Sequence, residues 1–258
     1  MIDSKAVVAH FTQLGDWSEE NKGSAVRSTA AWLQDQLQQL SVEHHRDTEG
    51  NSWITTPGKS DRIVVLGSYL NENTDDALQR HVGLVSGLEI IRAVARRDDG
   101  LPPCTLQIVV WSSARSSVFN VDRLTPSGLG EKVAAYLELH MADEAKAERG
   151  SVSNTSPADK DAVALNARLM ELCDEAVREL TGEPAPVPLR GQLTKPASEV
   201  PTAVMYFPAL GNSTGQDALH LHLLQAAEAF GRWTESTMHL VAGDEVNLWA
   251  REGRIPQS

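Results

Sequence analysis

The chain has 258 residues, with 35 acidic side chains against 23 basic ones and a formal net charge of −12 at pH 7. This length suffices for one domain with a sizeable core or for two small domains. The acidic balance, with no Lys/Arg run longer than a pair, argues against nucleic acid or an anionic membrane surface as a partner, because both bind clustered positive charge.

No segment has the ~18 consecutive apolar residues of a membrane-spanning helix. The N-terminal sequence also lacks the basic start and the apolar stretch of a signal peptide, so we expect a cytoplasmic protein. The two cysteines, Cys104 and Cys173, lie in apolar segments that we expect to form a strand and a helix. In a reducing compartment they are expected to be buried free thiols rather than a disulfide.

The first half of the chain alternates helices and strands. Apolar residues recur at helical spacing over 24–40, with Ser24 as the N-cap. A strand over Ser52–Thr56, a Pro-Gly turn and a buried strand over 62–70 follow. The next expected elements are a helix over 78–97, a buried strand over 105–111 and a strand over 136–141. The order strand, helix, strand favours a largely parallel sheet with helices on its faces.

The second half begins after a polar segment without periodicity, 142–161, which we interpret as a surface connection. Beyond this segment the pattern predicts a long helix over 162–182, a proline-rich loop, a strand over Thr202–Phe207 and a helix over 217–234. The tail from Gly243 onward matches no element.

Several short phrases occur in a characteristic order along the chain. They are 47–51 (DTEGN), 64–71 (VVLGSYLN), 87–89 (GLE), 136–140 (YLELH) and, more weakly, 201–208 (PTAVMYFP). Together they resemble the N-carbamoyl-L-amino-acid hydrolases and allantoate amidohydrolases, within the superfamily of dinuclear-zinc aminoacylases and carboxypeptidases. The resemblance implies an α/β fold, namely a three-layer αβα catalytic-type domain with a central, mostly parallel mixed sheet.

The metal site of that family holds two ions between His and acidic ligands, with a glutamate as general base on the bridging water. The resemblance places the family's site positions on Tyr69, Asn71, Gln79, Ala114, Arg115, His140, Thr214 and Gly215. Only His140 keeps a ligand residue, while Tyr69 replaces a histidine and Gln79 the bridging aspartate. Arg115 brings a permanent positive charge where two cations would sit. We therefore expect the family's zinc hydrolysis to be absent, with no metal and no other cofactor.

A lid domain that carries substrate contacts and the dimer interface follows the YLELH strand in the resembled enzymes. Here only the polar connection stands at that place. We therefore expect a single catalytic-type domain over 1–258, made of a first half 1–142, a linker 143–160 and a second half 161–258. The resemblance then no longer implies the family's lid closure or its dimer.

Arg115 is the leading candidate for a functional side chain. Its guanidinium could pair with the carboxylate of a ligand, or it could fill vacated space and bond to backbone carbonyls or a nearby acid. If the fold holds, Tyr69, Asn71, Gln79 and His140 surround it and form a polar, metal-free pocket.

Other conspicuous side chains have structural interpretations that fit them better. A lone imidazole such as His140 cannot hold zinc. His220 and His222 are two residues apart on an expected helix and therefore point to different faces of it, so they do not share a metal ion. The pair His44-His45 is expected to face solvent. The serines around Arg115 lack the Gly-x-Ser-x-Gly elbow of a nucleophile and are interpreted as a loop.

Two functions remain open at this point. The first is a non-catalytic descendant of the amidohydrolase fold that binds a small carboxylate-bearing molecule or amino-acid derivative, or pairs with an active enzyme. The second is a metal-independent enzyme acting on an amide, N-carbamoyl or related amino-acid-derived substrate. In it, Arg115 stabilises an oxyanion and His140 or Tyr69 transfers protons.

Overall fold

A computed structural model describes residues 2–20, 25–40, 42–70, 81–97, 100–112, 132–141, 160–182, 200–207 and 216–243. The described helices are α1 (Ser4–Glu20), α2 (Ala25–Gln38), α3 (Val82–Ala95), α5 (Lys160–Thr181) and α6 (Gln216–Ala242). The strands are β1 (Glu43–Arg46), β2 (Ser52–Thr56), β3 (Ser60–Tyr69), β4 (Cys104–Trp111), β5 (Val133–Met141) and β6 (Thr202–Phe207).

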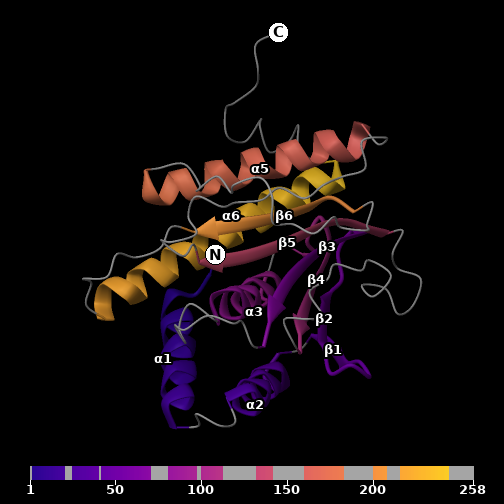
Figure 1. The fold of residues 1–258 in the computed structure, drawn as a ribbon. Helices are drawn as coiled ribbons and strands as arrows, with labels where there is room; N and C mark the ends of the chain where they lie inside the picture. Colours follow the sequence, from indigo (N-terminus) through magenta and orange to yellow (C-terminus); the bar gives the residue numbers. More distant parts are fainter. Residues whose placement is uncertain are drawn as a thin grey trace.

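The strands form a six-stranded sheet in the order β1-β2-β4-β3-β5-β6 (Figure 1). The four strands from β4 to β6 in that order run parallel to one another, whereas β2 pairs antiparallel with both β1 and β4. The domain is therefore a mixed α/β fold whose sheet is mostly parallel in its centre and is flanked by helices, as the sequence predicted. Because the parallel strands end at the same edge, their last residues lie close together there.

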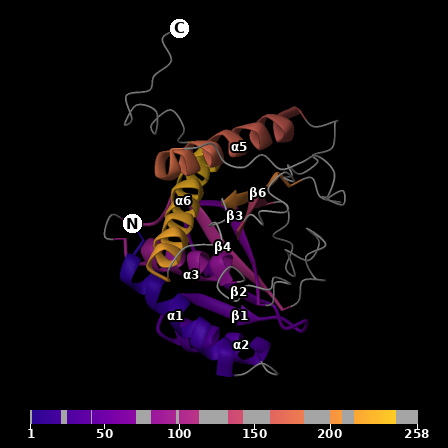
Figure 2. The same cartoon turned by 60° about the vertical axis from the view of Figure 1, so that its left-hand side comes forward.

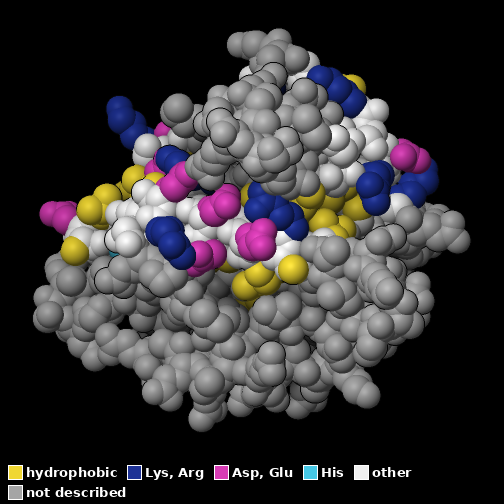
Figure 3. Space-filling view, turned by 90° about the horizontal axis from the view of Figure 1, so that it is seen from above, with side chains coloured by type: hydrophobic (Ala, Val, Ile, Leu, Met, Phe, Trp, Pro, Cys, Tyr) yellow, Lys and Arg dark blue, Asp and Glu magenta, His cyan; other side chains and the backbone are white. Residues whose placement is uncertain are grey.

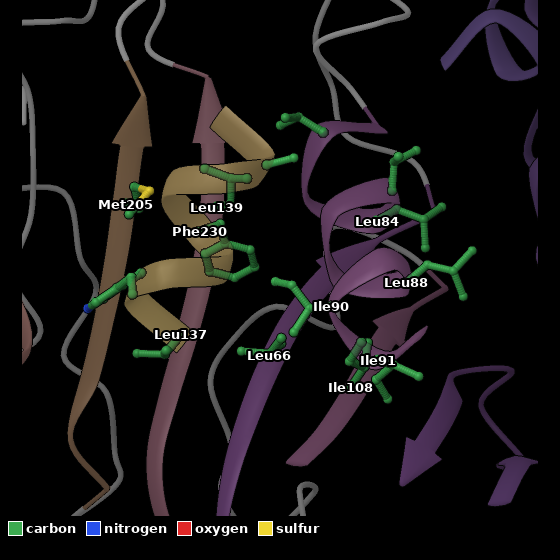
Figure 4. Close-up of a cluster of buried hydrophobic side chains, with 14 of the residues drawn as sticks. Leu66, Leu84, Leu88, Ile90, Ile91, Ile108, Leu137, Leu139, Met205 and Phe230 are labelled. Atoms are coloured by element: carbon green, nitrogen blue, oxygen red, sulfur yellow. The ribbon is translucent and has the colours of Figure 1, made fainter. Parts of the chain in front are cut away.

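One face of the sheet carries the main apolar cluster (Figure 4). On α3, Leu84, Leu88 and Ile91 recur at helical spacing and are buried in this cluster, and the helix contacts β3, β4 and β5. Phe230 of α6 packs on the same face. Burying each such side chain contributes ~1.5–3 kcal/mol. The helices α1, α2 and α5 add buried side chains to this same cluster (Figure 2), and α5 contacts both α6 and β6.

The opposite face of the sheet carries a second, more aromatic cluster. Its members are Trp53, Ile63, Val65, Tyr69, Val109, Trp111, Val133, Tyr136 and Val200. They come from strands β2 to β5 and from the residue two positions before β6, and none belongs to a described helix. The predicted site residue Tyr69 therefore lies on this aromatic face.

Several element bounds differ from the sequence-based expectation. The helix α1 and the short strand β1 were not predicted, and α6 continues eight residues past the expected end at 234. The predicted surface connection, apart from its last residues, and the tail from 244 onward lie outside the described residues. The predicted linker 143–160, apart from Lys160, also lies outside the described residues, and the single domain over 1–258 stays a prediction.

Both cysteines are buried and unbonded, as predicted. Burial raises the pKa of each thiol to about 12, so neither is a reactive thiolate at neutral pH. Within the described ranges, no helix has the length and apolar character that crossing a membrane requires. On the face seen in Figure 3, acidic and basic side chains of the described residues are interspersed rather than gathered by sign.

Candidate functional site

The carboxyl ends of β3, β4 and β5 bring several polar and aromatic side chains to one edge of the sheet. Tyr69 at the end of β3 is in register with Trp111 of β4, and Gly67 is in register with Glu138 of β5. Side chains alternate along a strand, so Tyr69 lies on the same face as Gly67, the aromatic one. Tyr69 is 6% exposed and Glu138 is 8% exposed. A buried carboxylate therefore lies beside a buried phenol.

Glu138 is the centre of a hydrogen-bond network. The Tyr69 hydroxyl donates to Oε1 of Glu138 at 2.7 Å, and the Tyr136 hydroxyl donates to the same oxygen. Trp111 in turn donates its Nε1–H to the Tyr136 hydroxyl at 3.0 Å. Hydrogen bonds to a carboxylate are about twice as strong as neutral ones. We call Tyr69, Trp111, Tyr136 and Glu138 the tyrosine–glutamate network.

Gly67 makes room for this network. A Cβ atom at position 67 would lie 1.8 Å from the Tyr136 hydroxyl oxygen and 2.3 Å from its Cζ. No side chain can occupy position 67 while the Tyr136 ring, which comes from β5, lies over Gly67 of β3. The glycine of the Gly67-Ser68-Tyr69 phrase is therefore a requirement of the network's geometry.

Tyr136 is fully buried, and burial is the largest cause that raises its pKa well above the usual value. The negative charge of Glu138 raises the pKa of Tyr136 further, because a tyrosinate beside a carboxylate would place two like charges together. The Tyr136 hydroxyl is therefore a protonated donor at neutral pH. The network holds a carboxylate through neutral donors.

The turn of residues 47–51 between β1 and β2 is hydrogen-bonded to Ser112, the residue that follows β4. The carboxylate of Asp47 accepts the backbone N–H groups of Glu49 and Asn51, both at 2.9 Å, and the Trp53 Nε1–H at 3.0 Å. Asn51 donates its side-chain N–H to Asp47 and accepts the backbone N–H of Ser112 at 2.9 Å. Burial raises the pKa of Asp47, but these hydrogen bonds outweigh it and the pKa is lowered.

This turn is also linked to the tyrosine–glutamate network. The rings of Trp53 and Trp111 meet edge to face, with their centroids 5.8 Å apart. The Asp47 turn, the end of β4 and the buried carboxylate of Glu138 thus form one continuous set of contacts along the carboxyl edge.

Among the predicted pocket residues, the structure describes the side chain of Tyr69 alone. His140 lies in β5, in register with Tyr206 of β6, and its side chain lies outside the described part. Arg115, Asn71 and Gln79 lie outside the described residues altogether, as do the positions 114, 214 and 215. The polar pocket around Arg115 therefore stays a prediction.

Several serine and histidine side chains that the sequence assigned to structural roles have partners in the structure or face solvent. Ser112 donates its hydroxyl to the carbonyl of Glu49 at 3.0 Å, and the remaining serines of its cluster lie outside the described residues. His222 packs edge-on against Phe207, with ring centroids 5.1 Å apart. The pair His44-His45 is exposed, as expected. The exposed ring of His45 stacks on Trp53, with the ring centroids 6.3 Å apart, so His45 contacts the Asp47 turn.

Sequence reasoning missed Glu138, Tyr136 and Trp111 as members of the site. A signal was present, because Glu138 is a charged residue within a strand of otherwise apolar character. Alternation also places Tyr136, Glu138 and His140 on one face of that strand. In the described part of the chain, no group of three or more His, Cys, Asp or Glu side chains is positioned to hold a metal ion.

Comparisons with known proteins are informative at the level of the fold. No family model matches the chain, and no curated protein matches it either. Solved structures do. A hydantoinase/carbamoylase-family amidase from Burkholderia multivorans aligns with 93% of this chain and 98% of its own, at a TM-score of 0.58 and 14% identity.

Two further solved structures show the breadth of the similarity. A putative amidohydrolase/peptidase from Burkholderia cenocepacia aligns at a TM-score of 0.60 and 12% identity, over 92% of this chain and 98% of its own. A Zn-dependent exopeptidase from Parabacteroides distasonis aligns at 0.54 and 11% identity, over 93% and 98%. The chain thus has the fold of hydantoinase/carbamoylase-family amidases and zinc-dependent peptidases, which is the fold that the sequence phrases predicted.

Proposed function

We propose that this protein is a metal-free, non-catalytic protein of the amidohydrolase-like fold, which binds a small carboxylate-bearing molecule derived from an amino acid. The binding site is the carboxyl edge of the sheet, with Arg115 as anion receptor and Tyr69, Asn71, Gln79 and His140 around it. We also propose that the protein is cytoplasmic, and the buried free thiols of Cys104 and Cys173 fit a reducing compartment.

The observation that carries the proposal is the hydrogen bond from Tyr69 to Glu138. The resemblance places a metal-binding histidine at position 69, and a histidine ligand presents a neutral nitrogen lone pair to the ion. Tyr69 instead presents a phenol whose proton is donated to Glu138. Tyrosine at this position therefore does not fit a dinuclear zinc site.

Charge supports the same conclusion. Glu138 is held by the two neutral phenols of Tyr69 and Tyr136, and Arg115 stands in the sequence position of a metal-binding carboxylate. A guanidinium close to a divalent cation is repelled by several kcal/mol at an effective dielectric constant of ~20. The same guanidinium favours a carboxylate, with which it forms a bidentate pair.

Binding measured in excess chelator tests the proposal. N-carbamoyl and N-acetyl L-amino acids are titrated against the protein while its intrinsic fluorescence is followed, since Trp111 lies within the network. We expect saturable binding without turnover, and a loss of affinity of at least about tenfold in Arg115→Gln. Arg178→Gln, which removes an exposed arginine paired with Asp174 on α5, is the matched control and should bind normally.

Two results would contradict the proposal. Absence of saturable binding by any of these compounds would remove its ligand. Turnover that persists in chelator and is abolished by Arg115→Ala would instead establish the metal-independent enzyme, in which the guanidinium stabilises an oxyanion.

A further inference from the structure

A pocket of about 370 Å³ lies between α3 and α6 beside the N-terminus, away from the carboxyl edge. Both ribbon views place the N-terminus next to these two helices (Figures 1 and 2). The helix α3 begins near the carboxyl ends of the strands, because a Cβ at Gly83 would lie 2.9 Å from the carbonyl of Leu139. The pocket is lined by the last turns of α3, ~12–20 Å farther along the helix.

The floor of the pocket is apolar. Ile90 and Val94 of α3, Met238 of α6 and Ile2 of the N-terminal segment contribute to it. Gly231 of α6 lets Ile2 approach the helix, since a Cβ there would lie 2.7 Å from the Ile2 Cδ1. A glycine in a helix interior costs ~1 kcal/mol relative to alanine. The close approach of Ile2 gives this glycine a physical reason.

The rim of the pocket is charged and evenly divided in sign. It consists of Arg97, two residues past the end of α3, and of Glu228, Arg232 and Glu235 from α6. Arg97 and Glu235 form an ion pair that joins the two helices across the rim. On α6, Arg232 pairs with Glu228 at 3.3 Å and with Glu179 of α5 at 2.6 Å. The α6 side of the rim thus presents both signs of charge, and Arg97 supplies a cation on the side of α3.

We propose that this pocket binds an α-amino acid with an apolar side chain, in its zwitterionic form. The ligand carboxylate binds Arg97, its ammonium binds Glu235, and its side chain lies on the floor of Ile90, Val94 and Met238. A guanidinium has five N–H donors and a carboxylate has about four lone pairs, so each can bind a ligand group while keeping its partner.

Charge complementarity selects the zwitterion over ligands with one charge. A carboxylic acid without an amine is attracted by Arg97 and repelled by Glu235, and a simple amine experiences the reverse. An uncharged apolar ligand would displace water from the ion pairs of the rim and offer them no hydrogen bonds in return. Its binding is therefore unfavourable. An apolar amino acid satisfies both charges and also buries its side chain.

The proposal concerns a site separate from the carboxyl edge and does not depend on the proposed function. Its test uses L-leucine as the probe, titrated by calorimetry and by NMR of the methyl groups. The comparison ligands are 4-methylpentanoate, which lacks the ammonium, 3-methylbutylamine, which lacks the carboxylate, and glycine, which lacks the side chain. Leucine is expected to bind at least about tenfold more tightly than each of the three.

The location is tested in the same experiment. Methyl signals of Ile90, Val94 and Met238 should shift during the titration, while those of Val65 and Val109 on the aromatic face should not. Ala93→Leu, which fills the pocket, and Glu235→Gln, which removes one charge of the rim, should each lower the affinity at least about tenfold. Glu171→Gln, which removes an exposed carboxylate of α5 outside the pocket, is the charge-matched control.

Three outcomes would overturn the proposal. They are the absence of leucine binding, equal binding of leucine and a ligand with a single charge, and unchanged affinity in both pocket variants. If the methyl signals of the aromatic face shift instead, leucine binds at the carboxyl edge and the pocket between α3 and α6 is not its site.

Discussion

Tyr69 and Glu138 meet because β3 lies beside β5, although the two residues are far apart in the chain. The sequence identified Tyr69 through its place in the Gly-Ser-Tyr phrase, and alternation along the strand put Glu138 on the face of Tyr136. It could not show which strand neighbours β5. The choice of partner is a property of the folded sheet, so the network itself could not be predicted.

The Asp47 turn makes stability depend on pH. Burial raises the pKa of Asp47, but its hydrogen bonds outweigh burial and hold the pKa below the ordinary value of 3.8, which the unfolded chain keeps. A lowered pKa in the folded state stabilises the protein above the unfolded pKa, and this stabilisation is lost as the pH falls through the folded pKa. The window therefore lies at and below ~4.

Asp47→Asn is expected to lower the free energy of unfolding at pH 7 by about 1–2 kcal/mol, because an amide cannot accept all four N–H groups. Urea unfolding between pH 7 and pH 3 measures this difference, which should shrink at the acid end. Asp35→Asn, at an exposed position of α2, is the control and should be neutral. A difference that stays constant with pH would show that the charge of Asp47 has no part in it.

The elements that the sequence predicted best are those with a buried face. The strands β2, β3, β4 and β6 and the helices α2 and α5 carry apolar runs or apolar residues at fixed spacing, and their predicted positions agree with the structure. The strand β1 escaped prediction because all of its side chains are exposed. It is held by backbone pairing with β2, which leaves no trace in hydropathy.

The first helix is a different case. Val7, Phe11 and Leu14 recur at helical spacing and are buried, so the pattern for α1 is present in the sequence. The helix α1 could therefore be predicted from the spacing of these residues, in the same way as α2 and α5.

Arg92 joins the two N-terminal helices to α3. Its guanidinium donates to Glu89 at 2.5 Å and to Gln36 of α2 at 2.5 Å, and it lies within hydrogen-bonding distance of Nε2 of His10 on α1. All four side chains are buried. Arg92→Met leaves the carboxylate of Glu89 buried without its guanidinium and should cost about 3–5 kcal/mol of unfolding free energy.

Urea unfolding of Arg92→Met and of the double variant Glu89→Leu with Arg92→Met checks this expectation. The double variant should lose less than the single one, because it no longer buries a carboxylate that has lost its guanidinium and keeps only the neighbouring His10. Arg178→Met on the exposed face of α5 should change stability by less than about 1 kcal/mol. A small effect of Arg92→Met, comparable with that of Arg178→Met, would contradict the assigned role.

At the scale of the whole molecule, this chain shares its fold with solved amidases and peptidases to which it is 11–14% identical in sequence. Apolar patterning and strand order suffice for that fold, because many apolar sequences can fill the same core. Filling the core does not determine which polar side chains stand at the carboxyl edge. The fold could therefore be predicted from a few phrases, whereas predicting the chemistry requires the position of each polar side chain.

The acidic excess of the chain acquires a more definite meaning in the structure. The acidic side chains Glu171, Asp174, Glu179 and Glu235 pair with arginines at the surfaces of α3, α5 and α6. Glu89 and Glu138 are the buried carboxylates of the described residues, and each is held by its own donors. These described carboxylates are therefore paired with arginines or with hydrogen-bond donors.

Metal content is the most direct test of the central claim that this fold acts here without metal. The protein is produced in medium supplemented with zinc and manganese, dialysed, and its bound metal is measured by mass spectrometry. We expect amounts well below one ion per chain, equal in the wild type and in Arg115→Gln. Zinc or manganese bound at close to stoichiometric amounts would contradict the claim.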